Sequence, residues 1–234
     1  MHIEPELISA GKMWLSYATA AGAGAHLLQL AWKEARDRGV LSVLIRSLVT
    51  TALVFCFFEV LPHYPIGVSE VHFILGSTLF LVFGTAPAAI GLALALLIQG
   101  LFFTPFDLPQ YGMNVTTLLV PLFALSALNR RIVKPDTPYV SLKYRHVLVL
   151  STTYQAGIVA WVAFWAVYGA GVTSENLSAI LSFGSAYMSV ILVEPLINLS
   201  VLAAAKILKG LRGSVLIERR LYASATSFNL RLCR

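Results

Sequence analysis

The 234-residue sequence has few charged residues and few cysteines. Asp, Glu, Lys and Arg make up 12% of the chain, about half of the roughly 25% that is typical of soluble globular domains. Two cysteines, Cys56 and Cys233, are too few for a disulfide framework. These shortages exclude a soluble enzyme, a disordered chain and a small secreted module held together by disulfides.

Several sequence motifs are also missing. The chain has no Walker A phosphate loop, no nucleophile elbow and no His-Glu-x-x-His zinc motif. Its first residues lack the basic region of a secretory signal, because Glu4 and Glu6 stand there instead. We therefore expect the chain to carry no ATPase of its own, and we expect Met1 to be retained.

Long apolar runs dominate what is present. Hydrophobic residues make up 58% of the chain, and the mean hydropathy is +0.78. A membrane-spanning helix needs about 20 such residues in succession. The runs predict an all-α membrane protein with about seven transmembrane helices in one compact bundle, at roughly 9–32, 43–61, 69–85, 87–104, 112–129, 146–168 and 180–205.

The third and fourth of these helices share one stretch, 71–106, that contains no Asp, Glu, Lys or Arg. This stretch is too long for one crossing. Gly84-Thr85-Ala86-Pro87 is the predicted break, because glycine and proline interrupt helices.

Basic residues predict the orientation of the bundle. With seven spans, every lysine and arginine except Lys12 falls on one side of the membrane. The positive-inside rule makes that side cytoplasmic, so we expect the N-terminus outside and the C-terminus in the cytoplasm. Most acidic residues fall on the opposite side, where they would attract cations: Glu4, Glu6, Glu59, Glu70, Asp107 and Glu175.

The first two residues, Met1 and His2, form a potential metal chelator. The terminal amine, the deprotonated amide of His2 and its imidazole place three nitrogens in one plane. Such tetragonal nitrogen sets suit Cu(II) and Ni(II), and low-spin Co(II) is compatible with them. A histidine at the second position also occurs by chance, so the motif needs a further donor before it indicates a site.

His72, at the outer start of the third helix, is the best candidate for that donor, because ionisable groups inside a membrane usually face a cavity or a partner. His63 lies in a proline-bounded outer loop and is a weaker candidate. Glu59 or Glu70 is placed to orient an imidazole as a hydrogen-bond acceptor, or is simply solvated at the interface. Asn114 either contacts a ligand or caps the fifth helix.

Two further features have no assigned role. Small residues crowd the first helix between Ala18 and Ala25, and they fit either a docking face for another membrane subunit or close internal packing. Glu194 precedes Pro195 within the seventh helix, where a carboxylate is costly and indicates a function in transport or partner contact.

Three features in this order resemble the CbiM/NikM family, the metal-specific capture components of energy-coupling factor (ECF) transporters. They are Met1-His2-Ile3 at the start, His72 followed by Gly76, and Gly112-Met113-Asn114 at the fifth helix. The likeness extends from residue 1 to about 131. The sequence departs from the family pattern at Glu4-Pro5-Glu6, Glu59, Val71 and Thr117-Leu118.

The resemblance implies a seven-helix protein of the prokaryotic cytoplasmic (inner) membrane that captures a divalent cobalt or nickel ion for an ABC-type importer. Met1, His2 and His72 then correspond to the metal ligands, with Glu59, Glu70 and Asn114 as candidates for supporting contacts. The implied partners are a transmembrane coupling subunit, a pair of cytoplasmic ATPases and a small accessory membrane subunit. Neither the family nor the sequence indicates nucleic-acid binding.

We expect one membrane domain over residues 1–222 and a short cytoplasmic tail over 223–234. Three alternatives to metal capture stay open: a vitamin-type capture subunit of the same machinery, a membrane enzyme that uses Glu59, His63, Glu70 and His72, and a structural partner subunit. The vitamin-type alternative leaves Met1-His2 without a purpose, and the enzyme requires activity in the isolated chain.

Overall fold

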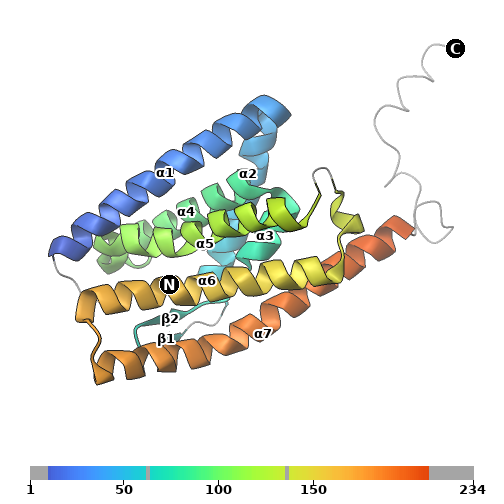
Figure 1. Ribbon diagram of the computed structural model, residues 1–234. Coiled ribbons are helices and arrows are strands. Elements are labelled where there is room, and N and C mark those ends of the chain that lie inside the picture. Colours follow the sequence, from blue (N-terminus) through green and yellow to red (C-terminus); the bar gives the residue numbers. More distant parts are fainter. Residues whose placement is uncertain (1–9, 62–63, 135–136, 211–234) are drawn as a thin grey trace, which may run out of the picture.

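The computed structural model describes residues 10–61, 64–134 and 137–210. The described residues form a helical bundle, which confirms the expected all-α membrane fold (Figure 1). Its α-helices are α1 (Ala10–Arg38), α2 (Val40–Glu59), α3 (Gly76–Phe83), α4 (Thr85–Phe102), α5 (Tyr111–Ile132), α6 (Tyr144–Ala170) and α7 (Ser174–Gly210). Two short 3₁₀ helices, η2 (Pro105–Gln110) and η3 (Tyr139–Ser141), precede α5 and α6.

Five segments of the described chain are long and apolar enough to cross a membrane: Val40–Glu59, Thr85–Phe102, Pro105–Ile132, Tyr144–Ala170 and Ser174–Ile207. Helix α1 is more polar, but its 29 residues extend about 1.5 Å each, enough for a hydrocarbon core of about 30 Å. It packs against α2, α4 and α5. Helix α3, with eight residues, is too short to cross the membrane by itself.

The prediction of one continuous helix at 69–85 is wrong in its first half. An antiparallel hairpin of β1 (Tyr64–Ile66) and β2 (Ser69–Val71) comes first. Its two-residue turn begins with Gly67, whose φ of 63° favours glycine. Residues 72–75 then continue without regular structure to α3. This stretch is apolar because it is buried in protein, where irregular backbone is tolerated at membrane depth.

The predicted break between the third and fourth helices is confirmed. Helix α3 ends at Phe83 and α4 begins at Thr85, with Gly84 between them at a φ of 93°. Pro87 falls in the first turn of α4, where its missing N–H costs no helical hydrogen bond.

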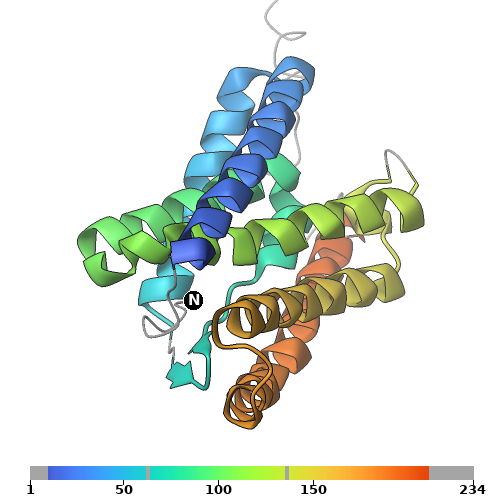
Figure 2. The same ribbon diagram turned by 60° about the vertical axis from the view of Figure 1, so that its left-hand side comes forward.

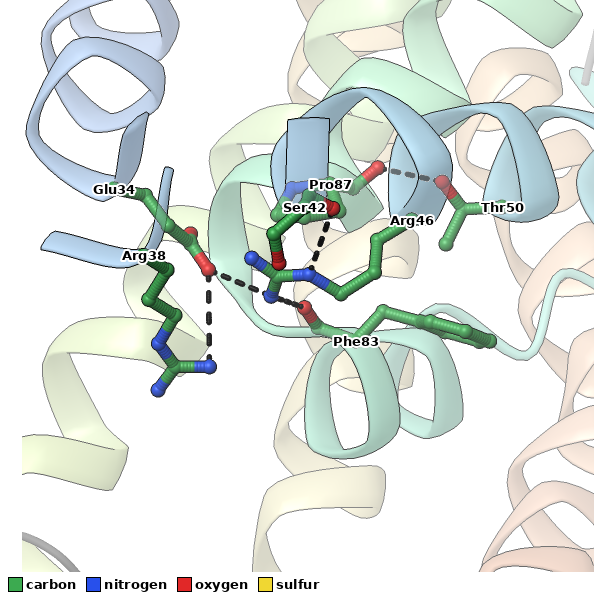
Figure 3. A network of polar contacts seen from close by, with 7 residues as sticks. All are labelled: Glu34, Arg38, Ser42, Arg46, Thr50, Phe83 and Pro87. Atoms are coloured by element: carbon green, nitrogen blue, oxygen red, sulfur yellow. Dashed lines mark hydrogen bonds and ion pairs between the residues drawn. The ribbon is translucent and has the colours of Figure 1, made fainter. Parts of the chain in front are cut away.

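Side chains of α2 and α1 hold this break in place (Figure 3). The Arg46 guanidinium donates to the Phe83 carbonyl oxygen, at the C-terminal end of α3, and to the Glu34 carboxylate, each at 2.7 Å. Thr50 Oγ1 donates to the Pro87 carbonyl oxygen, also at 2.7 Å. The α3–α4 connection is therefore bonded on both sides of Gly84.

Helices α4 and α5 form the centre of the bundle. Figure 2 shows α5 between the α1–α2 pair and the α6–α7 pair. Leu92 of α4, Leu118 and Leu122 of α5, and Ile158 of α6 are completely buried in one hydrophobic cluster. By contrast, large apolar side chains on the outer sides of α1 and α2 are exposed, as expected for a surface that faces lipid: Trp14, Leu28, Trp32, Leu41, Leu44 and Leu48.

The two ends of the bundle differ in charge. We call the end that bears the α1–α2 and α5–α6 connections the basic end, because Arg38, Arg46, Arg131, Arg145 and Lys206 lie there. A cavity of about 440 Å³ at this end is lined by residues of α1, α3, α5 and η3. The hairpin, the start of α1 and the α6–α7 connection lie toward the opposite end, which we call the hairpin end (Figure 1). The assignment of the basic end to the cytoplasm stays a prediction.

Candidate metal centre

His72 lies directly after β2, at the point where the hairpin leads into α3. Its side chain is completely buried. Side chains alternate along extended backbone, so Glu70 and His72 point to the same side of the segment. The hairpin therefore presents a carboxylate and an imidazole together.

Glu70 and His72 are in direct contact. The Glu70 Oε2 atom lies 2.9 Å from Nε2 of the imidazole. An ionised carboxylate only accepts hydrogen bonds, so Nε2 carries the proton and Nδ1 carries the lone pair in the neutral ring. A carboxylate that fixes the tautomer in this way is the usual partner of a metal-binding histidine, and it raises the basicity of the ligating nitrogen.

The Phe58 ring forms an apolar wall beside this pair. Phe58, near the end of α2, is fully buried, and its ring meets the imidazole edge-on at a centroid distance of 5.5 Å. Glu70 is partly open, with 23% of its side chain exposed. The imidazole is thus shielded from solvent while its carboxylate partner reaches the surface.

The other candidate supporting residues lie on different elements. Glu59, the last residue of α2, is half-buried, and the carboxylate bonded to the imidazole is that of Glu70. Asn114 is the fourth residue of α5 and buried, so the interpretation of Asn114 as a helix cap is wrong. Its Oδ1 atom accepts no hydrogen bond from the described part of the chain, which leaves this oxygen available to a ligand.

Met1, His2 and His63 lie outside the described residues. Residues 10–61, 64–134 and 137–210 contain no group of three or more His, Cys, Asp or Glu side chains that could hold a metal ion. The described part of the predicted site therefore consists of the His72 imidazole and the Glu70 carboxylate that contacts it. A complete nitrogen set requires the start of the chain.

The segment that carries His72 is tightly packed at both ends. At the hairpin turn, a Cβ atom on Gly67 would collide with the carbonyl oxygen of Ala179 in α7. At the start of α3, a Cβ atom on Gly76 would collide with the Tyr154 ring of α6. Glycine at these two positions lets the segment lie against α6 and α7.

A buried polar network next to this segment was not predicted from the sequence. Glu194 and Asn198 of α7 reach Ser77 of α3, and Asn198 also reaches Ser151 of α6. Glu194 stood out in the sequence as a carboxylate within an apolar span. Asn198 follows it by four residues and so shares its helix face, which was the available signal for the network.

Comparisons with known proteins agree with this fold. A crystal structure described as a transition metal transporter is 21% identical, with a TM-score of 0.65 and full coverage of both chains. One described as a truncated transition metal transporter is also 21% identical, with a TM-score of 0.63, covering 90% of this chain and 99% of the other. No curated protein matches the sequence at a significant level.

A family model gives the most direct result. The CbiM model, described as the cobalt uptake substrate-specific transmembrane region, matches residues 2–209. Because this match covers nearly the whole chain, the chain belongs to the CbiM family of multi-pass membrane proteins for metal uptake.

Proposed function

We propose that this protein is the metal-capture component of an ECF-type ABC importer, with cobalt as its first and nickel as its second expected substrate. The observation that supports this most strongly is the buried His72 imidazole, oriented by Glu70 at 2.9 Å, in a chain of the CbiM family. The transported ion is the substrate, and the chain itself performs no chemistry on it.

In the proposed site the ion is bound by nitrogen. The Met1 amine and the His2 amide and imidazole supply three nitrogens, and Nδ1 of His72 supplies the fourth. Four nitrogens in one plane suit Ni(II) and Co(II) in tetragonal fields. Burial of the imidazole beside Phe58 then removes the ion from water as the site closes.

Intrinsic affinity does not decide between the two ions. Nitrogen sites bind Ni(II) more tightly than Co(II) in the general order of divalent metals, and cells select by availability and geometry. We place cobalt first because the family model is described by cobalt uptake.

Energy for release must come from partners, since the sequence contains no phosphate-binding loop. The proposed partners are a transmembrane coupling subunit, a cytoplasmic ATPase pair and a small accessory membrane subunit. Helix α1 offers a docking face. Ala20 and Ala23 pack inward, whereas Ala18, Ala21, Gly22 and Ala25 are exposed. Exposed small residues let a second helix approach closely in lipid.

Calorimetric titration of the purified protein with Co(II) and Ni(II) tests the proposal. We expect one tight site, and we expect His72→Ala to lose most of the binding while the protein still folds and inserts. His26→Ala is the matched control, because the His26 ring packs on Phe123 of α5, away from the hairpin. His63→Ala should have a mild effect. Equal losses in the His72 and His26 variants, or no loss in either, would contradict the assignment.

A further inference from the structure

Glu194 is a carboxylate buried in the middle of α7, with no exposed surface. Such a group is costly in a membrane protein unless hydrogen bonds compensate for its lost hydration. Its Oε1 atom accepts two hydrogen bonds from one residue of α3: Ser77 N at 3.2 Å and Ser77 Oγ at 2.7 Å. The carboxylate of one helix is therefore bonded to the start of another.

The bond from Ser77 N acts as a helix cap, and the bond from Ser77 Oγ holds the carboxylate beside that N–H group. The first N–H groups of an α-helix have no partner within the helix, and a negative charge beside them is favourable. The residue before α3 is Leu75, and it makes no side-chain capping bond. Glu194 supplies from α7 the capping acceptor that α3 lacks in its own sequence.

Asn198 strengthens the same contact. Its Nδ2 atom donates to Ser77 Oγ at 2.7 Å and to Ser151 Oγ of α6 at 3.1 Å. Asn198 lies one helical turn after Glu194, so the two side chains reach Ser77 from the same face of α7. The start of α3 is thereby tied to both α6 and α7.

The segment needs this support, because α3 has only eight residues and isolated helices shorter than about 12 residues are marginal. Leu75, just before α3, adopts a φ of 52°, which is unfavourable for a residue with a side chain. Ser77 follows His72 by only five residues. The position of α3 therefore determines where the irregular 72–75 segment places the imidazole.

Helix α7 also holds the other end of the segment, through the close approach of Gly67 to Ala179. Ala179 and Glu194 are 15 residues apart on α7, which corresponds to about 22 Å along a helix. The segment that carries His72 is thus fixed at two separated points on one helix.

We propose that Glu194 is a positioning residue for metal capture: it caps α3 from α7 and so fixes His72 in the geometry of a metal ligand. This inference rests on the proposed role of His72 in metal binding. Glu194 itself touches no ligand of the proposed site. Its effect passes through Ser77 and the backbone of residues 72–76.

The test compares Glu194→Ala, Glu194→Gln and His72→Ala by Ni(II) titration and Ni(II) absorption spectroscopy on the full chain. Removing the hydrogen-bond partner of a ligand typically costs about 10- to 100-fold in metal affinity, and we expect the loss in Glu194→Ala to reach that range at most, because its effect on His72 passes through Ser77. Its spectrum should match that of His72→Ala, because both proteins would keep only the N-terminal nitrogens. Glu194→Gln keeps an oxygen acceptor for Ser77 and should bind like the native protein.

Ser126→Ala is the matched control, because it also removes an interhelical hydrogen bond, the partly buried one between Ser126 Oγ of α5 and Thr85 Oγ1 of α4 at 3.0 Å. If Glu194→Ala fails to fold, Glu194→Asp takes its place, since the shorter side chain keeps the charge but withdraws the acceptor oxygen from Ser77 N and Oγ. Native Ni(II) affinity with a native spectrum in Glu194→Ala, or in the variant that replaces it, would overturn the inference.

Hydrogen exchange without metal separates this inference from the proposed function. If the cap exists, amide exchange in residues 72–79 should be faster in Glu194→Ala and unchanged in Ser126→Ala. Unchanged exchange in Glu194→Ala would overturn the cap. If His72→Ala binds Ni(II) like the native protein, the proposed function fails at His72, and the positioning role fails with it, whatever the exchange data show.

Discussion

At the scale of single residues, the contact between Glu70 and His72 carries most of the chemistry that the structure describes. The 2.9 Å contact fixes which imidazole nitrogen holds the proton. It also sets the direction of the ring, because Glu70 is anchored in β2 opposite Pro65. The hairpin thus prepares the imidazole before any ion arrives.

Replacing Glu70 by Ala should weaken Co(II) and Ni(II) binding by about 10- to 100-fold, the usual effect of removing the partner of a ligating histidine. Titration calorimetry measures the change. Glu59→Ala is the control, because Glu59 lies on α2 and its carboxylate does not hold the imidazole. A larger loss in the Glu59 variant than in the Glu70 variant would contradict this assignment.

Sequence alone singled out His72 as a candidate ligand but did not choose between Glu59 and Glu70 as its neighbour. That choice depends on the hairpin, in which residues 70 and 72 share one side of extended backbone. A continuous helix at 69–85 would have separated the two side chains, since residues two apart on a helix do not face each other. The role of Asn114 was equally open, because a helix start that lies three residues earlier cannot be fixed from composition.

At the scale of elements, the apolar runs predicted six of the α-helices closely. They failed at residues 69–75, because hydropathy does not distinguish a segment buried by other helices from one that faces lipid. The Gly84–Pro87 break was predictable, since the geometry of glycine and proline is local. The polar contacts from Arg46 and Thr50 that hold this break could not be predicted, because they depend on how α2 packs.

Gly76→Ala should disturb the start of α3. The added Cβ atom would collide with the buried Tyr154 ring, and overpacking of this kind costs about 1–3 kcal/mol. We expect a lower melting temperature in detergent and weaker metal binding. Gly22→Ala is the control, because no atom lies within 4 Å of a Cβ atom there. Equal stability of the two variants would show that this contact is not tight.

If the exposed small residues of α1 form a docking face, replacing them by larger residues should impair assembly with a partner subunit. Ala21→Leu combined with Ala25→Leu should leave metal binding by the isolated protein unchanged, because both residues are exposed. The bulkier side chains should prevent close approach of a partner helix and so reduce co-purification of the proposed coupling subunit. The matched control replaces Leu28, an exposed apolar residue of the same helix, by Ala. Normal assembly of the double variant would place the docking face elsewhere.

At the scale of the whole molecule, the separation of charge predicts the orientation. The basic end carries the connections with most of the lysines and arginines, and the positive-inside rule places such loops in the cytoplasm. A reporter that is active only in the cytoplasm should therefore work when fused after Arg234 and also when fused after Arg145. A reporter that is active after Arg145 but inactive after Arg234 would show that the number of membrane crossings differs from the prediction.

In the predicted orientation, the two ends of the bundle face opposite sides of the membrane and have different functions. The hairpin end, with His72 and the start of α1, would face the outside and receive the ion. The basic end would face the proposed ATPase partners. Helix α7 runs between them, bonded to the His72 segment through Ser77 and to the α5–α6 connection through Lys206 Nζ and the Leu142 carbonyl oxygen at 2.9 Å.

The central claim is that the start of the chain and His72 together capture a transition metal ion. Its most direct test is Co(II) and Ni(II) uptake and binding, at equal expression, by three forms: native, N-terminally acetylated, and extended by one glycine before Met1. Acetylation removes one nitrogen donor, and the extension moves the histidine to position three and displaces His72 from the fourth site. Neither change touches an apolar span, so folding should be unaffected. We predict reduced uptake in both altered forms and reduced affinity at least in the acetylated one. Equal uptake and equal affinity in all three forms would contradict the claim.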